Sequence, residues 1–456
     1  MQKLSPSLIL LQLTSVSLLL SMTFASGAQA ESLIDIFDMA KAYDSTYQSA
    51  KSQFQANLAK ADQGKSSLLP TATLTGGASR SAYESFTNPT TVTTDRSYTT
   101  QTAGLNLSQP LYRPANLATY RQSQKILDAA QAALTQAEQD LIVRTSQAYF
   151  DVLGSQDSLT FVKAQKSAVA EQLASAKRNF EVGTAPITDT REAQARYDLV
   201  SAQEIAADND LRVKKVALEL LIGKPEIKPW NIKTQSILPP APEGPMETWV
   251  TTSEEIHPGI QQARTNLEVA KLEVEKAEAG HKPTVDFTLG YNAQKNLNGT
   301  SVSALPVTYN SNQIMITSAG LSASLPLFAG FATQNRIRET VALEEKARTD
   351  LEGIQRQVAQ ATRIAYLGLQ SGLSQVKALE AAEASSQAAL EANQLGYKVG
   401  VRINIDVLNS QSQLYQTKRD LAKARYDVLV GQLKLRQANG SLKADDLQAV
   451  NALLAK

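Results

Sequence analysis

The chain of 456 residues contains no cysteine, which excludes a disulfide-based scaffold and a cysteine-anchored lipoprotein. Histidine is almost absent as well. His257 and His281 each stand alone, and no HExxH, GxSxG or P-loop pattern occurs. The sequence therefore predicts no enzyme activity, no metal site and no cofactor, and we expect both histidines to have surface or capping roles.

Neither sign of charge dominates, because 45 lysines and arginines accompany 44 aspartates and glutamates, for a formal net charge of +1. This balance provides no basic surface for nucleic acid. Long apolar runs are also missing after residue 30, where none reaches the roughly 18 residues that a membrane helix needs. We therefore expect no nucleic-acid partner and no helical membrane span.

Residues 1–30 have the pattern of an export signal. Lys3 is their only charge, residues 8–20 are apolar with scattered serine and threonine, and Ala28–Ala30 has the small residues of a cleavage site. A membrane anchor is the alternative, but the apolar stretch is short for a span. We expect export and cleavage before Glu31.

Proline is absent from two long stretches, 116–181 and 332–398, and glycine is rare in both. A helix of roughly 65 residues is about 100 Å long, which exceeds the width of a single globular core. These helices are therefore expected to pack laterally as coiled-coil-like hairpins. Each reaches a Val-Gly turn, at Val182–Gly183 or Val399–Gly400, and we expect it to return through a second helix. The returning helices are expected at 187–221 and 405–437.

A pair of strand-like segments precedes each long helix. Alternation in Val285–Tyr291 places apolar residues on one face over about nine residues, the length of a tilted strand that crosses a bilayer. No residue between Asn296 and Asn335 is charged, which favours contact with lipid over a small soluble β-ribbon. The apolar phase changes in the last strand and predicts a bulge near Ser318–Ala319. The four strands are expected at 71–82, 97–111, 283–293 and 313–327, with external loops at 83–96 and 295–312.

The chain repeats this organisation. Leu105–Tyr112 returns as Leu321–Phe328 after 216 positions, and Phe180–Gly183 returns as Tyr397–Gly400 after 217. Such constant spacing indicates a duplicated unit. We divide the chain into the signal, 1–30; a first repeat, 31–222, with a helix over 32–65 and strand pair 71–111; a linking segment, 223–250; a second repeat, 251–440, with strand pair 283–327; and a tail, 441–456. Proline-rich Gly223–Gly244 is interpreted as a compact belt, with a disordered linker as the alternative.

Four strands cannot close a membrane barrel. An open sheet edge in hydrocarbon leaves unpaired N–H and C=O groups that each cost several kcal/mol, and the smallest membrane barrels have eight strands. The chain is therefore expected to share one barrel among protomers, with eight strands from a dimer or twelve from a trimer. The helices of all protomers then surround the same axis and continue the barrel as a tube.

These features resemble the TolC family of trimeric outer-membrane efflux and type I secretion channels, over the whole mature chain. The most specific stretches are Phe180–Gly183 with Ile187–Asp189, and Gly396–Arg402 with Ile405–Leu408; Leu421–Tyr426 extends the second. The resemblance implies an internally duplicated, mixed α and β membrane protein of a Gram-negative outer membrane. It implies a homotrimer with a shared twelve-stranded transmembrane β-barrel, a long periplasmic α-helical barrel and an equatorial belt that includes the tail.

In function, the resemblance implies a passive exit duct in contact with outer-membrane lipid. Its periplasmic tip is closed, and opens when the duct docks onto a periplasmic adaptor protein and an inner-membrane transporter. The Val-Gly turns Val182–Gly183 and Val399–Gly400 are then the docking tips. Two alternatives from other classes are a periplasmic adaptor, which has one hairpin and no amphipathic strand pairs, and a structural coiled-coil protein without a pore.

The resemblance also assigns candidate site residues. Threefold symmetry would repeat Asp406 as a ring of carboxylates at a pore constriction, which attracts cations. Family members often have a second acidic residue one turn further, where this chain has Asn409, so we expect a weaker negative ring. The alternative is that Asp406 only stabilises a helix N-terminus, by about 0.3–1 kcal/mol.

Tyr397 and Arg402 match family positions that tie the inner hairpin to the outer one near Asp189. An Arg–carboxylate hydrogen bond is directional and suits a latch that must break. A second link is assigned to Arg425 with Gln172. The alternative for these contacts is an exposed ion pair worth about 0–1 kcal/mol.

Overall fold

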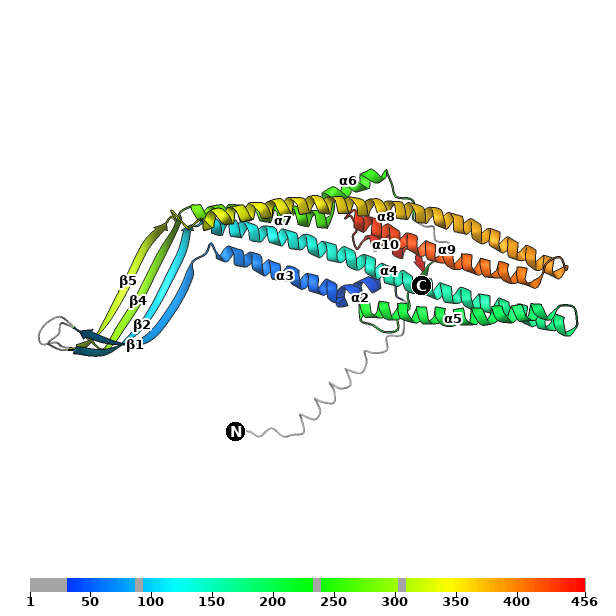
Figure 1. Cartoon of the computed structure of the whole chain (residues 1–456), viewed down its shortest axis with the longest axis horizontal. Helices are drawn as coiled ribbons and strands as arrows, with labels where there is room; N and C mark the ends of the chain where they lie inside the picture. The colour runs from blue at the N-terminus through cyan, green and yellow to red at the C-terminus, as the bar shows by residue number, and fades with distance from the viewer. Residues whose placement is uncertain (1–30, 87–92, 233–238, 302–308, 456) are drawn as a thin grey trace, which may run out of the picture. The chain divides into compact units, whose positions relative to one another are not determined.

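The computed structural model describes residues 31–86, 93–232, 239–301 and 309–455 (Figure 1). The predicted export signal lies outside these residues. The chain divides into two compact units. The helical unit comprises residues within 1–50, 135–257 and 356–456, and the strand unit comprises 51–134 and 258–355.

The strand unit contains a four-stranded antiparallel sheet in the order β1-β2-β4-β5. Its strands are β1 (Thr71–Phe86), β2 (Thr93–Tyr112), β4 (Thr284–Ser301) and β5 (Tyr309–Ser324). The central pairing of β2 with β4 joins the two repeats into one sheet. Within the described residues, β1 and β5 each pair on one side only, so both are open edges.

One face of this sheet is apolar. Leu74 lies opposite Leu105, and Leu105 lies opposite Tyr291, so the three share a face. Leu74 is 80% exposed. On the same face, Leu107 lies opposite Leu289. On the other face, β4 has polar or small residues, which is the alternation that membrane strands require. β5 departs from this pattern, because Ile314 and Ile316 pair with Gln294 and Asn292 on that face. The predicted common face of Val285–Tyr291 is confirmed.

Two predictions about the strands are wrong. β1 and β4 continue to Phe86 and Ser301, into the ranges that were predicted as external loops. No bulge occurs near Ser318–Ala319, where the pairing with β4 is continuous. Small side chains in this part of β5 fit on either face, so the change of phase needs no extra residue. The register instead shifts near Pro110 and between Asn296 and Thr300; proline has no N–H to donate to the ladder.

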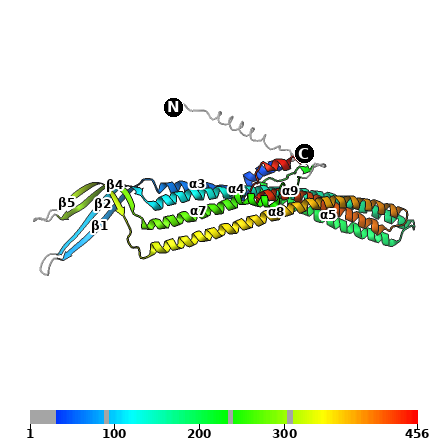
Figure 2. The ribbon, with the colours of Figure 1, turned by 90° about the horizontal axis from the view of Figure 1, so that it is seen from above.

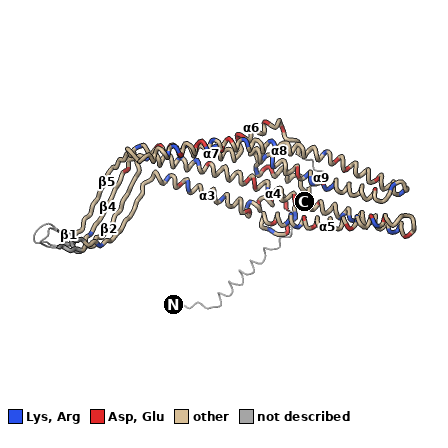
Figure 3. Tube along the Cα trace, viewed as in Figure 1, with Lys and Arg blue, Asp and Glu red and all other residues tan. Residues whose placement is uncertain are grey.

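The helices of the strand unit run side by side (Figures 1 and 2). They are parts of α3 (Ser45–Ser66), α4 (Pro114–Glu181) and α8 (Ala332–Lys398), together with α7 (Pro258–Glu278). Ion pairs join α4 to α7, including Lys125–Glu268 at 2.7 Å, and Arg336–Glu273 joins α8 to α7 at 2.6 Å. Figure 3 shows that charged residues are frequent along the helices and sparse on the strands.

The helical unit is built on the remaining parts of α4 and α8 and on their returning helices. These are α5 (Ile187–Ile222) and α9 (Asn404–Ala438), close to the predicted bounds. Apolar residues of α4, α5 and α9 form one buried cluster that includes Val169, Val200 and Leu408. Shorter elements complete the unit: α2 (Leu33–Tyr43), α6 (Met246–Ile256), α10 (Asp446–Asn451), and β3 (Asn231–Ile232) paired with β6 (Leu454–Ala455).

The predicted single helix over 32–65 is broken at Asp44, between α2 and α3. The Asp44 carboxylate accepts the backbone N–H of Tyr47 at 2.7 Å, which caps the start of α3. It also accepts two hydrogen bonds from Arg144 on α4, both at 3.0 Å. The break therefore depends on a residue 100 positions away in the sequence. None of the described helices is long and apolar enough to cross a membrane.

Candidate functional site

Two similar turns end the helical hairpins. We call α4 with α5 the first hairpin and α8 with α9 the second. Gly183 and Gly400 have φ of 74° and 80°, the left-handed conformation that glycine adopts without strain. The carbonyl of Asn179 accepts the N–H groups of residues 184 and 185, at 2.8 and 3.2 Å. The carbonyl of Gly396 does the same for residues 401 and 402, at 2.9 and 3.2 Å. Glycine is thus required at both helix ends.

The turns expose apolar side chains to solvent. Val182 and Val399 flank the two glycines and are 72% and 64% exposed, and Val401 is 75% exposed. Ile403 is also exposed at the second turn. Clustered exposed apolar residues are typical of surfaces that contact another protein.

Asn404 joins the two hairpins just behind the turns. This residue has 0% exposure. Its side-chain oxygen accepts a hydrogen bond from the amide of Gln172 on α4. Its side-chain nitrogen donates to the backbone carbonyl of Asp189 on α5, at 3.3 Å. Sequence reasoning missed Asn404, although a lone polar residue between Ile403 and Ile405 was a usable signal.

The predicted latch residues are close to the turns but have other partners within the chain. Arg402 lies 3.6 Å from the carboxylate of Asp406 in its own hairpin. The hydroxyl of Tyr397 accepts from the amide of Asn179, at 3.4 Å, across the two hairpins. The described part of the chain provides no ion-pair partner for the carboxylate of Asp189.

Arg425 and Gln172 are not brought together. Arg425 donates to Glu380 at 2.9 Å within the second hairpin, whereas Gln172 contacts Asn404. Because Arg425 follows Asn404 by 21 residues in one continuous helix, it lies about 30 Å further along α9. The expected pairing fails for this reason.

The two pore candidates lie on one face of α9, one turn apart. Asp406 is in the first turn of the helix, and its side chain is 33% exposed. The side-chain oxygen of Asn409 accepts from Arg196 on α5, at 2.7 Å. Asn409 therefore has a cationic neighbour that the sequence did not indicate.

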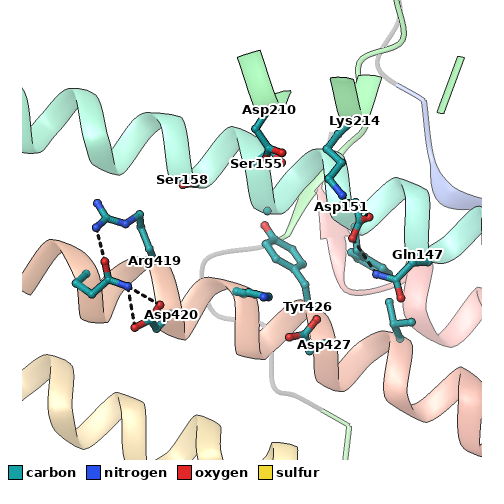
Figure 4. Close-up of a pocket in the computed structure, with 15 residues that line it drawn as sticks. Gln147, Asp151, Ser155, Ser158, Asp210, Lys214, Arg419, Asp420, Tyr426 and Asp427 are labelled. Atoms are coloured by element: carbon teal, nitrogen blue, oxygen red, sulfur yellow. Dashed lines mark hydrogen bonds and ion pairs between the residues drawn. The ribbon is translucent and has the colours of Figure 1, made fainter. Parts of the chain in front are cut away.

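A cavity of about 540 Å³ lies further from the turns, between α4, α5 and α9 (Figure 4). Two pairs of its polar groups are hydrogen-bonded: Ser155 donates to Asp210 at 2.6 Å, and Lys214 to Asp151 at 3.1 Å. These pairs link α4 to α5. The described residues contain no group of acidic, histidine or cysteine side chains that would hold a metal ion.

Next to this cavity, Tyr426 on α9 donates to the carboxylate of Asp157 on α4, at 2.6 Å. Burial raises the pKa of Asp157 above its usual value, and the hydrogen bond from Tyr426 opposes this shift. Burial also raises the pKa of Tyr426, so its hydroxyl remains a donor. This contact ties the first hairpin to the second far from the turns.

Comparison with known proteins agrees with this geometry. A family model described as "Outer membrane efflux protein" matches residues 37–224 and 249–441. The chain is 31% identical over 430 residues to the outer membrane protein TolC of Vibrio cholerae, covering 94% of this chain and 95% of that protein. It is 31% identical over 437 residues to the alkaline protease secretion protein AprF of Pseudomonas aeruginosa, covering 93% of this chain and 88% of that protein.

The fold is shared with solved channels. The open-state structure of the Neisseria gonorrhoeae MtrE outer membrane channel matches with a TM-score of 0.73 at 18% identity, covering 90% of each chain. Each range matched by the family model contains one strand pair and one helical hairpin. The chain therefore belongs to the TolC family of outer membrane efflux proteins.

Proposed function

We propose that three copies of this chain close a single channel and that the hairpin ends form its periplasmic gate. The chain is an outer-membrane efflux or type I secretion channel with a periplasmic helical part. TolC-family channels are trimeric and work with adaptor proteins and inner-membrane transporters. The observation that carries the proposal for this chain is its sheet, which has an apolar face and two open edges.

Joining three such sheets pairs β5 of one chain with β1 of the next and gives twelve strands. No backbone group at an edge then faces lipid unpaired. The Asp189 carboxylate, which has no ion-pair partner among the described residues, is proposed to meet Arg402 and Tyr397 of a neighbouring chain as the latch. The exposed turns Val182–Gly183 and Val399–Gly400 are proposed to dock on the adaptor.

The absence of cysteine makes the latch directly testable. The double variant Asp189→Cys/Arg402→Cys is expected to give disulfide-linked trimers under mild oxidation, because each chain would bond to both neighbours. Denaturing electrophoresis without reductant measures the product, and each single variant is the matched control. If the gel shows monomers alone, the proposed latch is wrong. If native mass measurement recovers no trimers, the proposed shared channel is wrong.

The acidic ring predicts a specific response to multivalent cations. Asp406→Asn removes three carboxylates from the constriction, so the cation concentration that half-blocks conductance in planar bilayers is expected to rise about tenfold. Asn409→Asp is expected to lower it, and to lower it further when combined with Arg196→Gln, because Arg196 otherwise neutralises the new carboxylate.

Asp208→Asn is the control, because Asp208 is on α5 and pairs with Arg212 at 2.8 Å. Equal block of the wild type and Asp406→Asn would place Asp406 outside the constriction and leave it only its helix-end role.

A further inference from the structure

A second cavity, of about 370 Å³, lies between the first and second hairpins, close to Asn409. Arg196 of α5 and Arg419 of α9 line it, together with amide side chains that include Gln165, Gln203 and Gln413. No carboxylate is among its lining residues. The cavity therefore has two fixed positive charges, because an arginine stays protonated in proteins.

Both arginines donate only to neutral oxygens. Arg196 donates to the side-chain oxygen of Asn409 at 2.7 Å. Arg419 donates to Gln165 at 3.2 Å and to Gln416 at 2.5 Å. In the part of the chain that the structure describes, neither guanidinium forms an ion pair with a carboxylate. Amide dipoles solvate a cation but do not cancel its charge.

Several other arginines of the helical unit have carboxylate partners. Arg144 pairs with Asp44, Arg363 with Glu247, and Arg436 with Asp446. Three such pairs show that this fold commonly compensates an arginine with an acid on a packed helix. The two arginines of the second cavity depart from that arrangement.

The residue that follows Arg419 is an acid, Asp420, and it is already hydrogen-bonded to an amide. Asp420 accepts both hydrogen bonds that the Gln416 amide donates, at 2.9 and 3.1 Å (Figure 4). It lines the larger cavity and not this one. Burial lowers the pKa of Arg419, and the neighbouring Asp420 opposes this only in part. The direction of the shift agrees with a positive charge that is incompletely compensated.

We propose that this cavity is a binding site for a small multivalent oxyanion. Guanidinium groups bind phosphate and carboxylate oxygens through paired, charge-assisted hydrogen bonds. The acceptors Asn409 and Gln416 are seven residues apart on α9, which corresponds to about 10 Å. An anion with two separated charged groups, such as pyrophosphate, is therefore preferred to orthophosphate.

The position of the site gives the ligand a structural effect. Arg196 belongs to the first hairpin and Arg419 to the second, so one bound anion holds the hairpins together. The bound anion is therefore expected to oppose opening of the gate. That effect rests on the proposed gate, whereas the binding itself does not depend on it.

The test is pyrophosphate binding by isothermal titration calorimetry, on the full-length purified protein in detergent. Sodium chloride of equal ionic strength is the reference, because salt screens non-specific attraction. We expect saturable binding that is weaker for orthophosphate. Arg196→Gln and Arg419→Gln are each expected to weaken pyrophosphate binding about tenfold, and the double variant to abolish it. Arg212→Gln on α5, whose arginine already pairs with Asp208, is the control and is expected to bind normally.

A second variant keeps the test independent of folding defects. Asn409→Asp keeps both arginines and gives Arg196 a carboxylate of its own, so it is expected to weaken pyrophosphate binding. No saturable binding by the wild type, or equal affinity in the wild type and the double arginine variant, would overturn the site. Neither result bears on trimer formation, which the cysteine crosslinks measure separately.

Discussion

Asn404→Ala is expected to raise single-channel conductance in planar bilayers, because it removes the buried contact between the two hairpin ends. Alanine leaves the Gln172 amide without its acceptor and removes the additional hydrogen bond to the Asp189 carbonyl, which also belongs to the helical hydrogen-bond pattern of α5. Both hydrogen bonds are part-buried, and a hydrogen bond of this kind contributes about 0.5–1.5 kcal/mol. Water satisfies both groups once the ends separate, so the cost falls on the closed arrangement alone.

The size of this effect follows from the two lost contacts. A net shift of about 1–3 kcal/mol per chain changes the ratio of open to closed hairpins by a factor of about 5 to 150. Three chains in one channel would each contribute this shift. Asn404→Ala should therefore give long-lived open states that the wild type rarely shows.

Asn393→Ala is the matched control. The amide of Asn393 donates to Ser410, which lies in the same hairpin, so its loss does not separate one hairpin from the other. Conductance is expected to stay at the wild-type level. If Asn404→Ala conducts like the wild type, or if both variants increase conductance equally, Asn404 is not a specific link between the hairpins.

Asp44→Ala is expected to lower the free energy of unfolding of the helical unit by about 2–4 kcal/mol. The Asp44 side chain is 8% exposed and accepts three hydrogen bonds, two of them from Arg144. Removing one partner of a buried pair costs about 3–5 kcal/mol, and the 35% exposure of the Arg144 side chain reduces that figure. Denaturant unfolding followed by far-ultraviolet circular dichroism measures the loss.

The same contact predicts a pH dependence. Hydrogen bonds from Arg144 hold the pKa of Asp44 below its usual value, against the effect of burial. A lowered pKa means that the stabilisation is complete above the pKa of the unfolded chain, about 3.9, and is lost as the pH falls through the folded value. The stability difference between the wild type and Asp44→Asn is therefore expected to shrink in acid.

Asp140→Ala is the control, because it removes the other partner of the same arginine. Asp140 lies 2.8 Å from Arg144, one turn away on α4, and its side chain is 51% exposed. Its loss is expected to cost about 0.5 kcal/mol or less. Similar losses in Asp44→Ala and Asp140→Ala would show that burial of the Asp44 pair does not matter.

The long helices were predictable from local sequence. The structure places α8 at Ala332–Lys398, the bounds that the absence of proline suggested. The positions of Gly183 and Gly400 were also predictable, because a left-handed helix end requires glycine. These features depend on residues that are close in the sequence, and each of them occurs in both repeats, which supported the prediction.

The helix break and the hairpin contacts were not predictable in this way. Asp44 ends α2 partly through Arg144, and Asn404 meets a residue 232 positions away. The change in the apolar alternation of β5 led to the wrong prediction of a bulge, because the small residues near Ser318 fit on either face of the sheet. A single sequence gives the face of an element more readily than the register between distant elements.

The pairing of β2 with β4 places both repeats in one sheet through hydrogen bonds from Thr99 to Tyr112. Continuity of the sheet therefore does not need a covalent connection between the repeats. What the connection ensures is stoichiometry: every first repeat is followed by one second repeat. A ring built from such fused halves can contain only strict alternation, so two diverged halves never assemble in the wrong order.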